Sequence, residues 1–211
     1  IFVTIDGKNA KDFDDAVLGE KDADGNLILY VAIADVGRYI DRGSNLDKEA
    51  FDRGTSVYFS QRVIPMLPEE LSNDLCSLKP NEDRFCLVCK TKIDKDGNLS
   101  DTSFFEALIN SKSRLTYSTV TREIEKKQFK RPYADSLKIL LEIYKRLKTN
   151  RVERGSLELE VPSYIPKVEN KKVTRFVDSP REISHMMIEE FMLAANISAA
   201  ELCLKHDMPS V

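Results

Sequence analysis

The sequence predicts an α+β fold in which helices surround a mixed, mostly antiparallel β-sheet. Two pairs of apolar segments are joined by Asp-Gly turns, at Asp24-Gly25 and at Asp96-Gly97, which is typical of β-hairpins. Apolar residues at helical spacing predict helices in the C-terminal half. With 211 residues, of which 42% are hydrophobic, the chain is long enough to bury a core in one or two domains.

A short strand is expected at residues 2–5, and four aspartates follow it closely. Asp6 ends this strand, and Asp12, Asp14 and Asp15 come shortly afterwards. Ionised carboxylates that are packed together repel one another and raise each other's pKa values. Such a cluster is therefore tolerable only where it is solvated or holds cations.

The spacing of these aspartates favours a loop over a regular element. On a strand, Asp12 and Asp14 would face away from Asp15, and on a helix Asp14 would point away from the other two. A loop or distorted strand that curls back toward Asp6 lets the carboxylates converge, and converging carboxylates suit Mg²⁺ or Mn²⁺. A solvated acidic loop is the alternative, and the residues alone leave both interpretations open.

The first hairpin is expected to pair residues 16–18 with residues 27–34. Residues 29–34 are nearly all apolar, as in a central strand that is covered on both faces. Asp35 ends this strand. We interpret Asp35 as a turn residue, with a fifth carboxylate near the acidic cluster as the alternative.

A helix and a long connection follow the first hairpin. Ser44 is expected to cap the N-terminus of the helix, with Asp47 in the capping-box position and Gly54 as its stop. Residues 54–78 contain two prolines and little periodicity, which predicts an ordered loop rather than a helix or a strand.

Two adjacent aromatic residues, Tyr58 and Phe59, lie in this loop. On sequence alone, we interpret them as residues that fill a core. The alternative is that their rings are exposed and offer a surface on which nucleic-acid bases stack.

The second hairpin is expected to pair residues 85–93 with residues 99–111. The acidic spacing at its turn is similar to that of an EF-hand, but Leu99 stands where the calcium loop needs glycine, so a turn is the better interpretation.

A helix is expected after Tyr117. Residues 136–148 have the apolar spacing of an amphipathic helix with a basic outer face.

The last helix has the clearest signals in the chain. Residues 157–161 alternate as a strand does, and the helix is expected further on, with Ser179 as its N-cap and Pro180 as its first residue. Its paired glutamates, Glu189 and Glu190, are interpreted as its solvent-exposed face.

Net charge, apolar segments and cysteines limit the classes of protein to which this chain can belong. The net charge of −3 does not indicate a nucleic-acid binder, although basic residues cluster at 126–131 and 145–154, and a local patch can contact phosphate. No segment is apolar enough to span a membrane and the start does not resemble a signal peptide, so a cytoplasmic protein is expected. Cys86 and Cys89 have metal-like spacing but would face opposite sides of a strand, so they are interpreted as buried free thiols.

Four segments together resemble the RNB catalytic domain of the ribonuclease II and ribonuclease R family, and the likeness is closest to the ribonuclease R members. They are the acidic segment (residues 5–16), a strand at residues 31–36, the loop at residues 54–78 and a helix at residues 188–200. The resemblance spans essentially the whole chain. It implies that residues 1–211 are the N-terminal portion of an RNB-type catalytic domain, which is incomplete without the family's later residues.

The resemblance implies a metal-dependent 3′-to-5′ exoribonuclease that hydrolyses single-stranded RNA processively to nucleoside 5′-monophosphates. By position, all four aspartates belong to the metal site. Asp6, Asp12 and Asp15 would hold Mg²⁺, or Mn²⁺ in its place, directly or through water, and Asp14 is the one most tied to the chemical step. Tyr58 matches the family tyrosine that packs against the 3′-terminal nucleotide and fixes where the RNA is cut.

The sequence also departs from the family pattern. Leu159 stands where members often carry a phenylalanine that clamps bases, so we expect clamping to be weaker or supplied by another residue. Later catalytic-domain residues and the flanking RNA-binding domains lie beyond this chain, so we expect the chain alone to be inactive or very feeble, and the longer protein to be a monomer.

Two other classes of function remain as alternatives. The first is a non-catalytic RNA-binding relative or scaffold, which has no need to bear the repulsion among four aspartates. The second is a structural domain that binds divalent ions, which leaves the loop at residues 54–78 unexplained.

Overall fold

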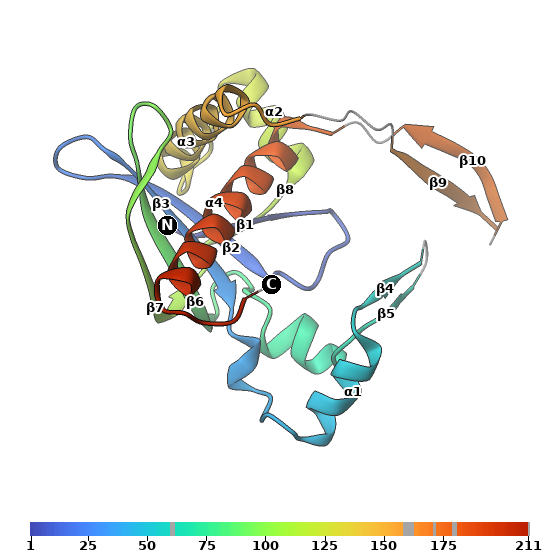
Figure 1. Cartoon of the computed structure of the whole chain (residues 1–211). Helices are drawn as coiled ribbons and strands as arrows, with labels where there is room; N and C mark the ends of the chain where they lie inside the picture. Colours follow the sequence, from blue (N-terminus) through green and yellow to red (C-terminus); the bar gives the residue numbers. More distant parts are fainter. Residues whose placement is uncertain (60–61, 158–162, 171, 179–180, 211) are drawn as a thin grey trace.

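The structure is a computed structural model that describes residues 1–59, 62–157, 163–170, 172–178 and 181–210. Its centre is a six-stranded sheet in the order β7-β6-β3-β2-β1-β8, in which β1 and β8 are parallel and the other neighbours antiparallel (Figure 1). The strands of this sheet are β1 (Val3–Asp6), β2 (Asp15–Lys21), β3 (Leu27–Ala34), β6 (Asp83–Ile93), β7 (Leu99–Asn110) and β8 (Ser113–Thr116). The predicted fold class is confirmed.

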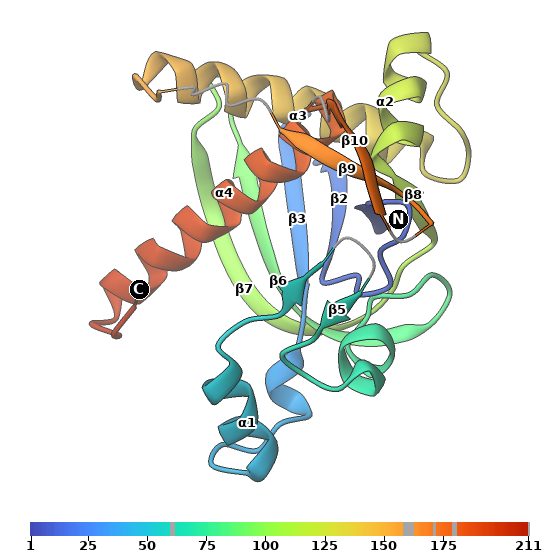
Figure 2. The ribbon, with the colours of Figure 1, turned by 90° about the vertical axis from the view of Figure 1, so that its right-hand side faces the viewer.

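Three helices enclose the larger core against one face of the sheet, and α4 crosses the strands diagonally (Figure 2). They are α2 (Tyr117–Lys126), α3 (Ala134–Glu153) and α4 (Ile183–Lys205). Leu29 and Val31 of β3 share this core with Leu140 of α3 and Phe191 of α4, and all four are almost fully buried. Burying one such side chain contributes about 1.5–3 kcal/mol to stability.

Loops cover the opposite face of the sheet. Successive residues of a strand point to opposite faces, so Ala32 and Ala34 of β3 face away from the helices. They pack in a second core cluster with Val88 of β6 and with Phe13 and Leu78, which come from two loops. This cluster attaches both the acidic segment and the connection at residues 54–78 to the sheet.

Both predicted hairpins of the main sheet are confirmed, as β2–β3 and β6–β7. In each turn a leading aspartate, Asp22 or Asp94, accepts backbone hydrogen bonds from the residues two and four positions later, at 2.8–3.0 Å. Aspartate side chains that bond to their own backbone in this way stabilise turns. The second turn is therefore an ordinary hairpin turn, as predicted.

The connection between α1 (Asn45–Arg53) and β6 contains more regular structure than the sequence predicts. Ser44 caps α1 and Gly54 ends it, as expected. The connection then forms a small β-hairpin from β4 (Val57–Tyr58) and β5 (Val63–Ile64), and a single π-helical turn, η2 (Leu71–Leu75). The expectation of a loop without elements was wrong, because strands of two residues are too short to give a periodic signal.

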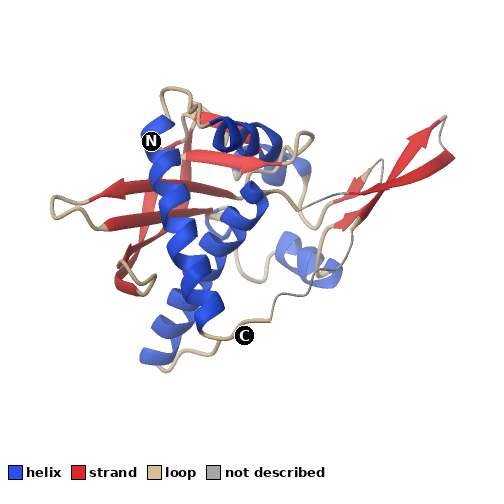
Figure 3. Ribbon diagram, turned by 90° about the horizontal axis from the view of Figure 1, so that it is seen from above, coloured by secondary structure: helices blue, strands red, loops and turns tan. Residues whose placement is uncertain are grey.

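A further hairpin, β9 (Tyr164–Glu169) and β10 (Lys172–Asp178), projects away from the body of the molecule (Figure 3). This hairpin was not predicted from the sequence. Most of the strand expected at residues 157–161 lies outside the described residues, as do Leu159, Ser179 and Pro180. The last helix begins at Ile183, with Glu182 as its N-cap, rather than at residue 180.

The paired glutamates of α4 do not form a solvent-exposed face. Glu190 is only 6% exposed, and Arg151 of α3 donates to Glu190 Oε1 at 2.7 Å and to Glu189 Oε1 at 3.1 Å. The prediction was wrong because the arginine that compensates this charge lies on another helix. The spacing of residues within α4 does not indicate that Arg151 of α3 pairs with these glutamates.

The cysteines lie as the sequence predicts. Cys86 and Cys89 belong to the two different core clusters, on opposite faces of β6, and all four cysteines are free thiols. In the described part of the chain, no helix has both the length and the apolar character that crossing a membrane requires.

We predict that Gly97→Ala destabilises the fold more than Gly25→Ala. Both glycines occupy hairpin turns with φ of +82° and +80°, where an alanine costs about 1–2 kcal/mol. A Cβ at Gly97 would also lie 2.4 Å from the carbonyl oxygen of Arg146 on α3, whereas one at Gly25 meets nothing within 4 Å. Urea titrations should show a further loss of about 1–3 kcal/mol for the Gly97 variant. Equal losses would contradict this close approach.

Candidate metal centre

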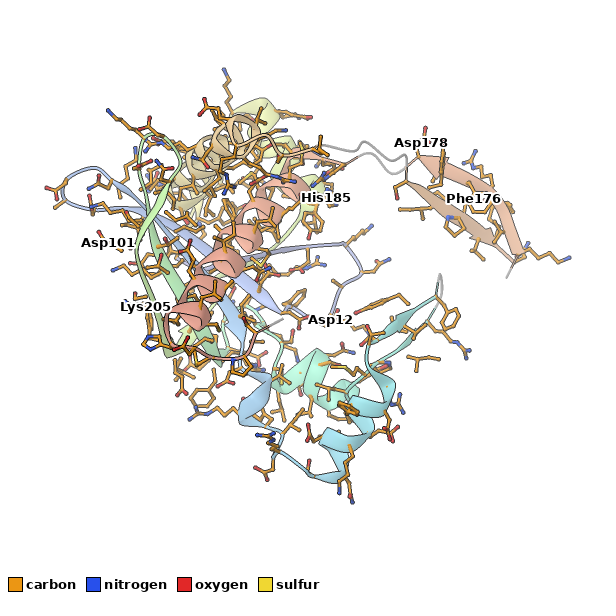
Figure 4. The ribbon with its side chains drawn as sticks, in the orientation of Figure 1. Asp12, Asp101, Phe176, Asp178, His185 and Lys205 are labelled. Atoms are coloured by element: carbon orange, nitrogen blue, oxygen red, sulfur yellow. The ribbon has the colours of Figure 1, made fainter. Side chains whose placement is uncertain are left out.

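The four aspartates gather at one end of the sheet. Asp6 is the last residue of β1 and Asp15 is the first residue of β2. Because these strands are antiparallel neighbours, the two residues lie at the same end. Asp12 and Asp14 lie on the loop between the strands, and Figure 4 shows Asp12 beyond the end of the sheet. The predicted strand ending at Asp6, followed by a loop that curls back, is therefore observed.

Phe13 anchors the acidic segment between Asp12 and Asp14. Its side chain is 8% exposed and packs in the second core cluster. Its backbone N–H donates to Ser77 Oγ at 3.0 Å, and its carbonyl accepts from the N–H of Leu78 at 2.9 Å. The apolar ring therefore turns inward, while Asp14 next to it remains exposed.

Two residues that are distant in sequence hold the rest of the segment. The hydroxyl of Ser77, which is fully buried, also donates to the carbonyl of Lys11 at 2.8 Å. Nη2 of Arg114 donates to the carbonyls of Gly7 and Lys8 at 2.6 and 2.8 Å. Ser77 and Arg114 were not predicted from the sequence, since no local pattern marks a residue that contacts a loop so far away in the chain.

Charge repulsion couples the carboxylates. Burial, followed by the charge of Asp15, raises the pKa of Asp6 to about 7, and the nearby Arg114 acts in the opposite direction. Burial and then the charge of Asp14 raise the pKa of Asp15 to about 6. The pKa of Asp14 is raised by partial desolvation and then by Asp12. The structure thus brings the four predicted residues close enough to influence one another.

The cluster fits a divalent cation in its chemistry. Carboxylate oxygens are the ligands that such cations prefer, and Oδ2 of Asp6 and Oδ2 of Asp15 are buried without a hydrogen-bond partner. A buried polar atom without a partner is costly, and a cation would satisfy both oxygens. Among the described residues, no three acidic, histidine or cysteine side chains are already gathered into a metal site. Asp12 and Asp14, whose charges also raise the pKa of Asp6, are the carboxylates that would join the buried pair at a shared ion.

Tyr58 and Phe59 do not fill a core. Their side chains are 66% and 53% exposed, so the interpretation made from sequence alone was wrong. The hydroxyl of Tyr58 donates to Oδ2 of Asp12 at 3.2 Å. The β4–β5 hairpin therefore places an exposed aromatic ring directly beside the acidic segment.

Tyr117 lies next to the buried pair of carboxylates. Because β8 runs parallel to β1 with Thr116 opposite Asp6, Tyr117 begins α2 beside the cluster. Burial, followed by the charges of Asp6 and Asp15, raises the pKa of Tyr117 to about 12. Its ring stacks on His185 of α4, with the ring centroids 3.9 Å apart, so α2 and α4 also contribute to the surroundings of the site.

Comparison with known proteins identifies the family. A family model, the RNB domain, matches residues 1–211, which is the whole chain. This chain belongs to the RNB-domain family. The family expected from the acidic segment and the three accompanying segments is confirmed.

Relatives and solved structures agree with this membership. Ribonuclease R of Vibrio parahaemolyticus is 46% identical to the RNB-domain chain over 215 residues, which cover 99% of the chain but 26% of the relative. The chain therefore spans about a quarter of the length of this curated relative. Mycoplasma genitalium RNase R, solved in complex with ribose methylated single-stranded RNA, superposes with a TM-score of 0.93 at 32% identity, covering 98% of this chain and 33% of the other.

A more distant solved structure shares the fold alone. Yeast Ssd1, described as a pseudonuclease, superposes with a TM-score of 0.73 at 20% identity, over 95% of this chain and 24% of the other. At this identity the likeness concerns the arrangement of helices and strands. It carries no conclusion about activity.

We predict that Ser77→Ala lowers the free energy of unfolding by about 1–3 kcal/mol, because it leaves the buried N–H of Phe13 and the carbonyl of Lys11 without their partner. Ser111→Ala is the matched control, since Ser111 Oγ is equally buried and makes no hydrogen bond. Urea titrations measure both losses, and hydrogen exchange at the Phe13 amide should accelerate only in the Ser77 variant. Equal behaviour of the two variants would show that Ser77 does not hold the acidic segment.

Proposed function

We propose that the longer protein containing this chain is a metal-dependent 3′-to-5′ exoribonuclease that hydrolyses RNA processively to nucleoside 5′-monophosphates. The supporting observation is the cluster of four aspartates at the end of the sheet, with partnerless buried oxygens on Asp6 and Asp15. It occurs in an RNB-domain chain whose relatives at 46% identity are named ribonuclease R. The chain would supply the acidic part of the active site.

Mg²⁺ is the proposed cofactor, with Mn²⁺ as a substitute. When bound, a divalent ion activates water and neutralises charge on the attacking and leaving oxygens of a phosphodiester. The buried oxygens of Asp6 and Asp15 would provide the fixed side of the site. Asp12, on the loop between the two strands, would complete it directly or through water.

Asp14 is the residue that we assign to the chemical step. It is the most exposed of the four aspartates, so its carboxylate is accessible to an attacking water. The anchored ring of Phe13 beside it fixes the backbone from which it projects. Neither a serine nor a histidine nucleophile is needed for hydrolysis of this type.

Tyr58 is the proposed contact for the 3′-terminal nucleotide of single-stranded RNA. Its exposed ring offers a stacking surface, and its hydrogen bond to Asp12 ties that surface to the acidic cluster. A base stacked there would place the adjoining phosphate near the aspartates, which would fix where the RNA is cut. Stacking is tolerant of base identity, so cleavage should depend little on sequence.

A non-catalytic RNA-binding relative or scaffold is the alternative. Four aspartates favour catalysis, because a scaffold has no need to bear the repulsion that helps raise the pKa of Asp6 to about 7.

We also propose a cytoplasmic location and a monomeric state for the longer protein. The four free cysteines suit a reducing compartment. The 211-residue chain alone should have little or no activity, since it would supply only part of the site.

We predict that Asp14→Asn in the full-length protein reduces RNA hydrolysis at least about 100-fold, without unfolding, because the side chain is exposed. With Mg²⁺ and 5′-labelled single-stranded RNA, the wild type should shorten the RNA stepwise from its 3′ end. EDTA should stop this reaction and added Mg²⁺ should restore it. Asp101→Asn is the matched control, since Asp101 is an exposed aspartate far from Asp12 in Figure 4.

The same assay can contradict the proposal. RNA that is bound equally by wild type and variant, and shortened by neither, would favour the scaffold. Robust processive turnover by residues 1–211 alone would refute the expectation that the chain holds only part of the site.

We predict that Tyr58→Ala lengthens the final product of RNA degradation. Loss of the ring removes about 1–3 kcal/mol of stacking on the terminal base, so the shortened RNA dissociates earlier. Tyr58→Phe keeps the ring and loses only the hydrogen bond to Asp12, so it should preserve the product length. Phe59→Ala, which removes the neighbouring exposed ring, should have a smaller effect. An unchanged product length with Tyr58→Ala, measured on a sequencing gel, would remove Tyr58 from this role.

A further inference from the structure

We infer that Arg114 is a positioning residue for the proposed metal site. It holds the first half of the acidic segment so that Asp6 and Asp12 can share one cation. This inference rests on the proposed function, and it concerns a residue of β8 that lies far from the aspartates in the sequence.

The contacts of Arg114 lie directly after Asp6. Nη2 donates to both Gly7 and Lys8, the two residues that lead the chain out of β1. The guanidinium carbon also lies 5.5 Å from the centre of the Phe13 ring. Arg114 therefore lies against the acidic segment near its start, at Gly7 and Lys8, and again toward its end, at Phe13.

This part of the segment has little other support. A Cβ built on Gly7 would meet nothing within 4 Å. Besides Arg114, the Gly7 carbonyl accepts from the N–H of Ala10 at 3.1 Å, a bond within the segment itself. Among the hydrogen bonds of the described residues, the side-chain bonds that reach Gly7 and Lys8 both come from Arg114. Ser77 holds only the later part, at Lys11 and beyond.

The charge of Arg114 makes the inference sharply testable. A cation bound by Asp6 would be repelled by the nearby guanidinium. If Arg114 acted only as a counter-ion for the aspartates, its removal would therefore strengthen cation binding. If it positions the backbone, its removal should weaken cation binding in spite of the lost repulsion.

The experiment measures the Mn²⁺ dissociation constant of the full-length protein, from the electron paramagnetic resonance signal of the free ion, and the Mg²⁺ concentration that gives half-maximal RNA shortening. For Arg114→Ala we expect both values to rise by about 10-fold to 100-fold, as for other residues that orient metal ligands. Arg114→Lys should lie between this variant and the wild type, since lysine keeps the charge but loses the planar fork.

Arg146→Ala is the matched control. Arg146 also binds a turn carbonyl through its guanidinium, that of Asp94 at 3.0 Å, and pairs with Glu142, but it contacts no part of the acidic segment. It should leave both metal values unchanged. RNA binding measured in EDTA should be the same for all variants, which separates misplaced metal ligands from a general loss of structure.

Each outcome decides the question. Unchanged or tighter Mn²⁺ and Mg²⁺ values in both Arg114 variants would overturn the positioning role. The positioning role would also be overturned if RNA binding in EDTA weakened by as much as metal binding, because the variants would then have lost structure in general. If the wild type binds Mn²⁺ too weakly for a dissociation constant to be measured but still shortens RNA, the Mg²⁺ concentration for half-maximal shortening decides. A wild type that neither binds Mn²⁺ nor shortens RNA would instead refute the proposed function itself.

Discussion

Repulsion among four carboxylates at one end of the sheet is the constraint on which the site depends. Left to themselves, these side chains would move apart into solvent, because separation lowers their mutual energy. The fold opposes this by fixing the backbone, while the nearby Arg114 offsets part of the negative charge at Asp6. β1 and β2 hold Asp6 and Asp15 as strand ends, and Phe13 draws the intervening segment into the core. The repulsion that remains is what a bound cation would relieve.

The two faces of the sheet contribute differently to this arrangement. The face covered by helices contains the larger core and supplies most of the apolar burial. The face covered by loops contains a smaller cluster, in which Phe13 and Leu78 pack beside Ala32. Because these two loops share that cluster with the central strand, the acidic segment and the connection that carries Tyr58 are held to the same rigid support.

The sequence was informative where the signal is local. Asp-Gly turns located both hairpins of the main sheet, and Ser44 and Gly54 bounded α1. It failed where the signal depends on a distant partner. Glu190 looked like a surface residue because Arg151 lies on another helix, and Tyr58 looked like a core residue because nothing nearby shows which way the β4–β5 hairpin faces.

The sequence by itself determined the identity and spacing of the acidic residues, and with them the family. The identity and spacing of residues belong to the order of amino acids along the chain, so they can be seen without knowing how the chain folds. The tertiary structure alone decided which groups hold the acidic segment in place. Ser77 and Arg114 reach it from 64 and 107 residues away, and contacts over such separations exist only after the sheet has brought β1 beside β8 and the loops onto its open face.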